Sequence, residues 1–304
     1  MHIFQQENVD GPIFRTRWKL PVIRLDMLKL ENQLPFFVLQ ELYLLTSLGH
    51  EPPLIHLALK FFGPLVITSA QKTPIQDLFL EHTPDHLLAL FHSTFNPEYH
   101  PLQSVSGSLM QRKCLVPSVR ELKQVGIFLR SGEGDLLDIK YHDYHMTGKA
   151  SLEIPPLFID YKTGPILRNL VAYEQCNKSV KPYFTSYIMF FDGLVNTPVD
   201  VEILRNKRIF YHVLGSNQEV SELLNDRTKD VAYDWHDCYL SPLIHKIHLR
   251  RNKTYLKRSR QRSDANIFPH QSVVYHILSH STFLLLYLTV IQTLFTVISY
   301  IRPH

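Results

Sequence analysis

The chain has 304 residues, of which 45% are hydrophobic and 20% are charged. This composition is typical of a folded globular protein and excludes a disordered chain. The formal net charge of +4 is too small by itself to indicate nucleic-acid binding. The basic residues are concentrated, because eight Lys and Arg and no acidic residue lie between Lys246 and Arg262.

The cysteines and the N-terminus bear on the cellular compartment. The three cysteines, Cys114, Cys176 and Cys238, are far apart and odd in number. Such spacing favours neither a disulfide framework nor a metal site, so we expect the main domain in a reducing cytosol. Residues 1–18 lack a basic segment followed by an apolar one, and no signal peptide is predicted.

The first two predicted helices flank a polar corner. Residues 20–30 have helical apolar spacing, and a second helix is predicted to end near residue 48. Pro35 is expected at the first position of that helix, where its missing N–H costs nothing, with Asn32 or Gln33 as the cap. We interpret the corner as a turn between packed helices. A ligand-binding corner is the alternative.

Further helices and a small sheet follow along the chain. Helices are predicted at residues 54–62, 84–95 and 117–125, with a long, poorly ordered linker after the second. Strands are predicted at residues 127–129, 136–141 and 151–159, and a small antiparallel sheet is the simplest arrangement. The remaining helices are predicted at residues 165–176 with Thr163 as cap, 183–195, 199–206, and 216–224 with a Ser216/Glu219 capping box.

The C-terminal segment predicts membrane attachment. Residues 282–301 carry no charge, and twelve of these twenty are Leu, Ile, Val or Phe. A helix of this length is about 30 Å long, the thickness of a bilayer core, whereas a buried core helix is the alternative. The basic stretch before it predicts a cytosolic main domain and a tail anchor, with the plasma membrane favoured. That stretch is expected either to bind anionic lipid head groups or to be a solvated linker.

These patterns together predict a mainly α fold with a small antiparallel β-sheet in the middle third (α+β), plus a single C-terminal transmembrane helix. The predicted parts are a helix-rich soluble domain at residues 1–240, a basic juxtamembrane segment at 241–271 and a transmembrane helix at 272–301.

No motif for chemistry is recognised. A Gly-rich phosphate loop, a nucleophile elbow and an HExxH motif are absent from the sequence. Three histidine pairs have spacings that suit a metal but no evident third ligand, and we interpret them as solvated or interfacial: His142/His145, His245/His248 and His276/His280. Three acidic residues fall in or just after a glycine-rich turn and are interpreted as solvated: Glu133, Asp135 and Asp138.

Several stretches, in order, resemble the plant family known as domain of unknown function 247. They are LKLENQLPFFVLQELY, VPSVRELKQVGIFL, LLDIKY, LEIPPLFID, LRNLVAYEQC, VNTPVDVEIL and LTVIQTLF. Family members usually carry a further N-terminal region, whereas only about thirty residues precede the Glu-Asn-Gln motif here. We expect either that Met1 is not the natural start or that this copy has lost part of the domain. The resemblance implies a plant-specific, mostly uncharacterised protein that ends in a membrane helix. Some members are associated with pollen–stigma self-incompatibility in grasses, which suggests recognition or signalling.

We therefore expect a membrane-anchored recognition or scaffold protein that contacts the lipid bilayer and an unidentified protein partner. No catalytic residue, cofactor, metal or nucleic-acid partner is predicted. One alternative is an enzyme with an unrecognised site, for which the candidates are Asp160, Arg168 and Glu174. The other is a truncated family copy with reduced or no function, in which the helices of residues 28–48 would expose an apolar face.

Overall fold

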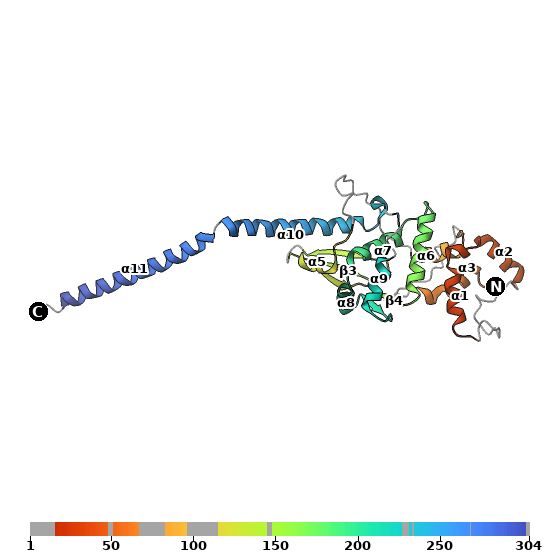
Figure 1. Cartoon of the computed structure of the whole chain (residues 1–304), viewed down its shortest axis with the longest axis horizontal. Coiled ribbons are helices and arrows are strands. Elements are labelled where there is room, and N and C mark those ends of the chain that lie inside the picture. The colour runs from red at the N-terminus through yellow and green to blue at the C-terminus, as the bar shows by residue number, and fades with distance from the viewer. Residues whose placement is uncertain are drawn as a thin grey trace. The chain divides into compact units, whose positions relative to one another are not determined.

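The computed structural model describes residues 16–47, 51–66, 83–95, 115–144, 148–226, 231–232, 234–267 and 269–301, apart from the side chains of residues 260–277, 295 and 298–301 (Figure 1). The chain divides into two compact units, Met1–His248 and Leu249–His304. The predicted linker falls largely on residues 96–114, and Cys114, His145 and the side chain of His276 also lie outside the described residues.

The N-terminal third is helical. Its elements are α1 (Lys19–Met27), the 3-10 turn η2 (Leu30–Asn32), α2 (Phe36–Thr46), α3 (Leu54–Phe62), the 3-10 turn η3 (Gly63–Leu65) and α4 (Leu87–Ser93). The prediction for α3 is confirmed at both ends. Leu54, Leu57, Phe61 and their neighbours on one face of α3 are buried, because apolar residues recur at helical spacing.

The polar corner is a turn that joins two helices. The Gln33 amide Nε2 donates hydrogen bonds to the carbonyl oxygens of Met27 (2.9 Å) and Lys29 (2.6 Å), and its Oε1 accepts from the Leu88 backbone N–H (2.9 Å). Gln33 therefore provides hydrogen-bond partners for backbone groups at the end of α1 and at the beginning of α4. The expected cap on α2 is wrong, because Pro35 itself occupies the N-cap position and no side chain caps that helix.

The sheet is mixed, so the predicted antiparallel sheet is wrong. Strands β1 (Ile127–Ser131), β2 (Lys140–Tyr144) and β3 (Lys149–Ile154) lie in the order β1-β3-β2. The β2–β3 pair is antiparallel, but β1 runs parallel to β3. Residues 132–139 cross over after β1 and bury Leu136, Leu137 and Ile139, which leaves the position beside β1 to β3.

Two strand boundaries also differ from the prediction. The segment at residues 136–139 has alternating apolar residues but forms a turn, in which the Asp138 N–H donates to the Asp135 carbonyl. The strand predicted at residues 151–159 is interrupted at Pro155 and Pro156, because proline has no N–H to give to a ladder. Its second half is β4 (Leu157–Ile159), which pairs in parallel with β5 (Phe210–His212) in a separate two-stranded sheet.

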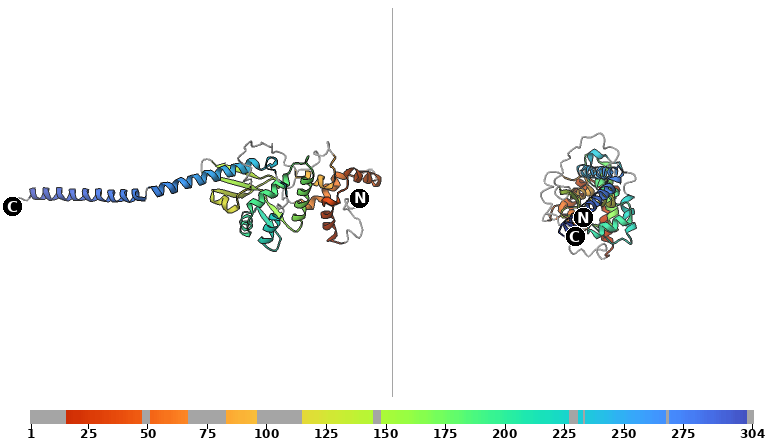
Figure 2. Two further views of the ribbon diagram at one scale, coloured as in Figure 1. Left: turned by 45° about the horizontal axis from the view of Figure 1, so that its top comes forward. Right: turned by 90° about the vertical axis from the view of Figure 1, so that its left-hand side faces the viewer.

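The remaining helices of the first unit surround these strands. They are α5 (Val119–Gln124), α6 (Thr163–Cys176), α7 (Tyr183–Leu194), α8 (Pro198–Asn206) and α9 (Asn217–Asn225). Helix α6 lies between the N-terminal helices and α7 (Figure 1), as the left view of Figure 2 also shows. The predicted cap Ser216 accepts the Glu219 N–H, whereas the Glu219 carboxylate accepts the N–H of Gly215.

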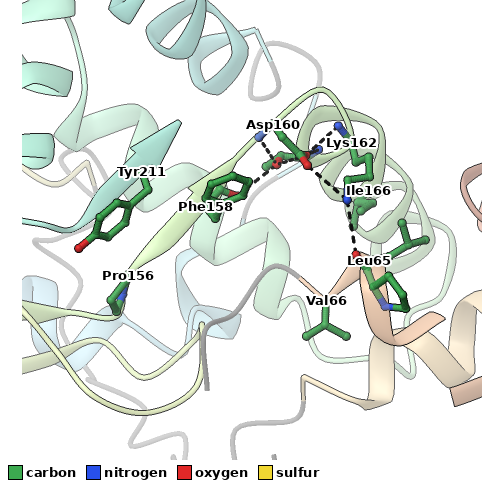
Figure 3. A pocket seen from close by; sticks show the side chains of 10 residues that line it. Leu65, Val66, Pro156, Phe158, Asp160, Lys162, Ile166 and Tyr211 are labelled. Carbon is green, nitrogen blue, oxygen red and sulfur yellow. Dashed lines mark hydrogen bonds and ion pairs between the residues drawn. The ribbon is translucent and has the colours of Figure 1, made fainter. Parts of the chain in front are cut away.

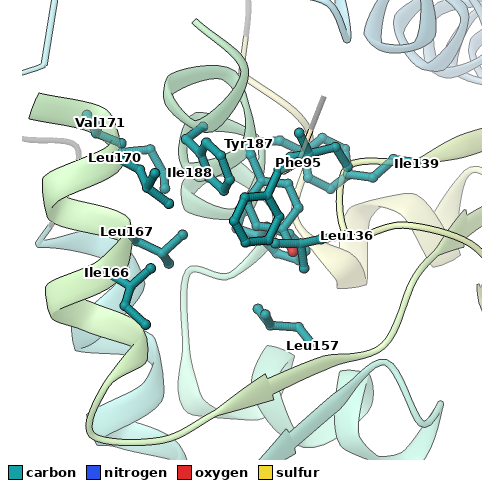
Figure 4. Close-up of a cluster of buried hydrophobic side chains, with 14 of the residues drawn as sticks. Phe95, Leu136, Ile139, Leu157, Ile166, Leu167, Leu170, Val171, Tyr187 and Ile188 are labelled. Atoms are coloured by element: carbon teal, nitrogen blue, oxygen red, sulfur yellow. The ribbon is translucent and has the colours of Figure 1, made fainter. Parts of the chain in front are cut away.

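The hydrophobic core of the first unit is continuous from the N-terminal helices to α9. Leu167 and Leu170 of α6 point toward Tyr187 of α7, with Phe95 and Leu136 close by (Figure 4). All five side chains are buried. Helix α6 is thus held in a fixed place, and the groups that it carries are positioned by the core.

Two long helices end the described chain, α10 (Ser241–Ile267) and α11 (Pro269–Ile301). Leu243, Ile244 and Ile247, near the beginning of α10, are buried in the first unit. Unit 2 begins at Leu249 and contains the rest of α10 and all of α11.

The C-terminal transmembrane helix predicted at residues 272–301 is not supported. No helix among the described residues is long and apolar enough to cross a membrane, so for these residues the prediction is wrong. The apolar run is shortened by polar residues 279–282 and by Thr289, Gln292 and Thr293. The cytosolic position of the main domain stays a prediction.

Candidate functional site

A pocket of about 510 Å³ lies at the beginning of α6, beside β4, β5 and η3 (Figure 3). Phe158 and Tyr211 are register partners on β4 and β5, and each ring is about half exposed. The other apolar lining residues are Pro64, Leu65, Val66, Pro156 and Ile166. Apolar walls with few polar groups are common in ligand pockets. The charged residues that line this pocket are Asp160 and Lys162.

Asp160 stands at the edge of this pocket and anchors the first turn of α6. Its Oδ1 accepts hydrogen bonds from the backbone N–H groups of Lys162 (2.9 Å) and Thr163 (3.2 Å) and from the Thr163 hydroxyl (3.2 Å). Its Oδ2 lies 3.3 Å from Lys162 Nζ, which also donates to the Pro64 carbonyl. The carboxylate is therefore engaged in starting the helix. The predicted cap Thr163 is wrong, because Thr163 is the first residue of α6 and the N-cap position is Lys162.

Glu174 is buried near the other end of α6, where it caps α7. Its side chain is 0% exposed, and its oxygens accept the backbone N–H groups of Phe184 (2.8 Å) and Thr185 (2.7 Å) and the Thr185 hydroxyl (2.8 Å). His92 Nε2 of α4 lies 2.8 Å from the same carboxylate. The N-cap position of α7 is occupied by Pro182, whose side chain has no acceptor, so Glu174 supplies the missing cap from another helix.

The three residues considered for catalysis do not converge. Asp160 and Glu174 stand at opposite ends of α6, about 20 Å apart at 1.5 Å per residue. The side chain of Arg168 is exposed between them. Both carboxylates hold helix beginnings, and Asp160 lines the pocket whereas Glu174 does not. These three residues therefore do not form the joint catalytic site that the enzyme alternative requires.

The histidine and acidic groups that the structure describes have other local partners. His142 pairs with Glu153 at 3.3 Å on the sheet, and the Asp138 carboxylate accepts the Asp135 N–H within its own turn. Among the residues that the structure describes, no group of three His, Cys, Asp or Glu is arranged to hold a metal ion. Of the cysteines that the structure describes, Cys176 and Cys238 form no disulfide.

In the first unit, the outer face of α2 exposes several large apolar side chains. We define the α2 outer face as Phe37, Glu41, Leu44 and Leu45. Phe37 is 69% exposed and Leu45 is 82% exposed, while only Phe36 and Tyr43 of this helix are buried. Residues 37, 41, 44 and 45 share one side of a helix, so the apolar groups are contiguous and Glu41 is the one charge among them. The sequence reasoning anticipated such a face for the truncated copy.

Comparison with known proteins assigns the family. Residues 1–286 match the family model DUF247, described as plant protein of unknown function. The chain belongs to this family. It is 31% identical over 276 residues to the UPF0481 protein At3g47200 of Arabidopsis thaliana, covering 82% of this chain and 55% of that protein. It is also 31% identical over 117 residues to the putative UPF0481 protein At3g02645 of the same plant, covering 38% and 21%.

The DUF247 chain thus spans about half the length of the first of these relatives. No solved structure matches it. The stretches that suggested the family have structural roles here: one contains Gln33 and α2, and another forms most of α6 with Glu174. A third contains Thr197 and Asp200, which form a capping box at the beginning of α8 with the Asp200 side chain buried. These three family stretches therefore have structural roles, and family membership assigns no chemistry.

Proposed function

We propose that the chain is a protein-recognition or scaffold module whose α2 outer face binds an amphipathic helix of a partner protein. The observation that carries the proposal is the exposure of Phe37, Leu44 and Leu45 on one side of a single helix. Contiguous apolar patches on soluble proteins are typical of interaction sites.

The chemistry of the face defines the partner. Phe37 and Leu44 are seven residues apart, two turns along one side of α2, and Leu45 widens this strip. A helix with apolar residues at the same spacing would cover the strip, as in recognition of a helix by an apolar surface. Glu41 lies within the strip, so the partner helix is expected to carry a Lys or Arg opposite it.

A non-catalytic role is part of this proposal. Its support is that Asp160 and Glu174, the buried carboxylates considered for catalysis, are engaged in beginning α6 and α7. A general acid or base needs a proton-accepting position within reach of a substrate. The Asp160 carboxylate already accepts from two backbone N–H groups and a hydroxyl, and that of Glu174 does the same.

The test compares aspartate substitutions on the α2 outer face with an aspartate substitution at another exposed apolar residue. A chain with a photo-crosslinker at position 41 is expected to capture one plant protein, and Leu44→Asp with Leu45→Asp should abolish that crosslink. Val213→Asp, also at an exposed apolar residue (66%), is the matched control and should retain it. Circular dichroism must show equal folding of all variants. A crosslink of the same strength in the double variant overturns the proposal, as does a product whose contact segment is not an amphipathic helix.

A further inference from the structure

Helix α10 carries a dense set of cations in the second unit. Between residues 249 and 258 there are five, namely Arg250, Arg251, Lys253, Lys257 and Arg258, and no Asp or Glu. Lys253 and Lys257 are exposed, whereas Arg250 is partly buried. Arg250, Lys253 and Lys257 are three and seven residues apart, so they share one side of the helix.

Two large apolar side chains lie in the same sector. Leu249 is 46% exposed and Leu256 is 61% exposed. At 100° per residue, these leucines and the cations Arg250, Lys253 and Lys257 fall within roughly 120° of the helix circumference. One side of α10 therefore presents positive charge and apolar groups together.

We propose that this side of α10, residues 249–257, binds the surface of an anionic phospholipid membrane. The ammonium and guanidinium groups would contact lipid phosphates and carboxylates, while Leu249 and Leu256 enter the boundary between head groups and acyl chains. Long cationic side chains suit this position, because their stems lie along apolar surface while the charged ends remain in the polar layer. The contact lies along the helix surface and requires no segment that crosses the bilayer.

Charge and apolarity together favour a lipid surface over an acidic polypeptide. An acidic peptide would match Lys253 and Lys257 but would leave Leu249 and Leu256 in water. An anionic membrane satisfies both kinds of group, since basic residues near it are attracted electrostatically and leucines gain from burial.

The test is flotation of the full chain with vesicles of phosphatidylcholine alone or with one-fifth phosphatidylserine. The chain should bind the anionic vesicles at least ten-fold more strongly, and the difference should disappear in high salt. Lys253→Gln with Lys257→Gln should weaken binding to anionic vesicles by about 30-fold. The matched control is Lys123→Gln with Lys207→Gln, two exposed lysines of the first unit, and it should bind as the wild type does.

The apolar half of the proposal has its own variant. Leu249→Ser with Leu256→Ser keeps every charge and should still reduce vesicle binding several-fold. Equal binding to neutral and anionic vesicles overturns the proposal. Loss in the lysine variant without loss in the leucine variant, together with displacement by polyglutamate, would instead identify an acidic polypeptide as the ligand and also overturn it.

Discussion

Replacing Glu174 with alanine removes the cap of α7 and tests the central polar contact of the fold. The change leaves the buried N–H groups of Phe184 and Thr185 without an acceptor. Each such group costs about 1–3 kcal/mol, so the free energy of unfolding should fall by about 4 kcal/mol. The loss is large compared with a total stability of about 5–15 kcal/mol. Glu174→Gln keeps one acceptor oxygen and should lose about half as much.

Urea unfolding of the full chain, followed by circular dichroism, measures this loss. With a slope of about 2 kcal/mol per molar urea, the midpoint should fall by about 2 M for Glu174→Ala. The control is Glu202→Ala, at an exposed position on α8, which should stay within about 0.5 kcal/mol of the wild type. If Glu174→Ala unfolds at the same urea concentration as this control, the carboxylate does not cap α7 and the reasoning is refuted.

Three further changes probe other contacts by the same unfolding assay. A Cβ at Gly193 would lie 2.6 Å from the Val116 carbonyl oxygen, so Gly193→Ala should destabilise by about 1–3 kcal/mol, whereas Gly63→Ala meets nothing within 4 Å and should be neutral; equal effects would contradict this. Gln33→Glu places an anion against two backbone carbonyls and should cost about 1–3 kcal/mol, and wild-type stability would show that the corner is not held by this amide. Burial lowers the pKa of His86 below its ordinary 6.5, so its contribution to stability is present above pH 6.5 and is lost as the pH falls toward the lowered pKa; His86→Ser should remove that part of the pH dependence, and an unchanged slope would refute it.

The helices with local signals were predictable from the sequence. The segment at residues 54–62 has helical apolar spacing after a proline, and its limits match α3. The sheet was harder to predict. An alternating pattern indicates which residues of a strand lie on one face, but not which strand pairs with it. The parallel pairing of Ile127 with Ala150 depends on the crossover of residues 132–139, which reads locally as another strand.

The polar contacts that hold the fold were harder to anticipate. Glu174 lies ten residues before Phe184, yet it caps α7 only because α6 and α7 pack side by side. Gln33 is 55 residues from Leu88, the residue whose N–H it accepts. In both cases a side chain on one element accepts a backbone N–H at the beginning of another helix. The spacing of residues in the sequence does not indicate such a contact. The exposure of α2 was predicted only for a truncated copy, in which the helices of residues 28–48 would lack the part against which they normally pack.

The buried beginning of α10 determines where the chain can be cut. A fragment that ended at residue 240 would lose Leu243, Ile244 and Ile247 from the core. Burying each such side chain contributes about 1.5–3 kcal/mol, so the cut would remove about 5–9 kcal/mol, comparable to the stability of a whole domain. A recombinant fragment ending at His248 keeps all three. Limited proteolysis should likewise spare the first two turns of α10 and cleave among the exposed arginines and lysines that follow.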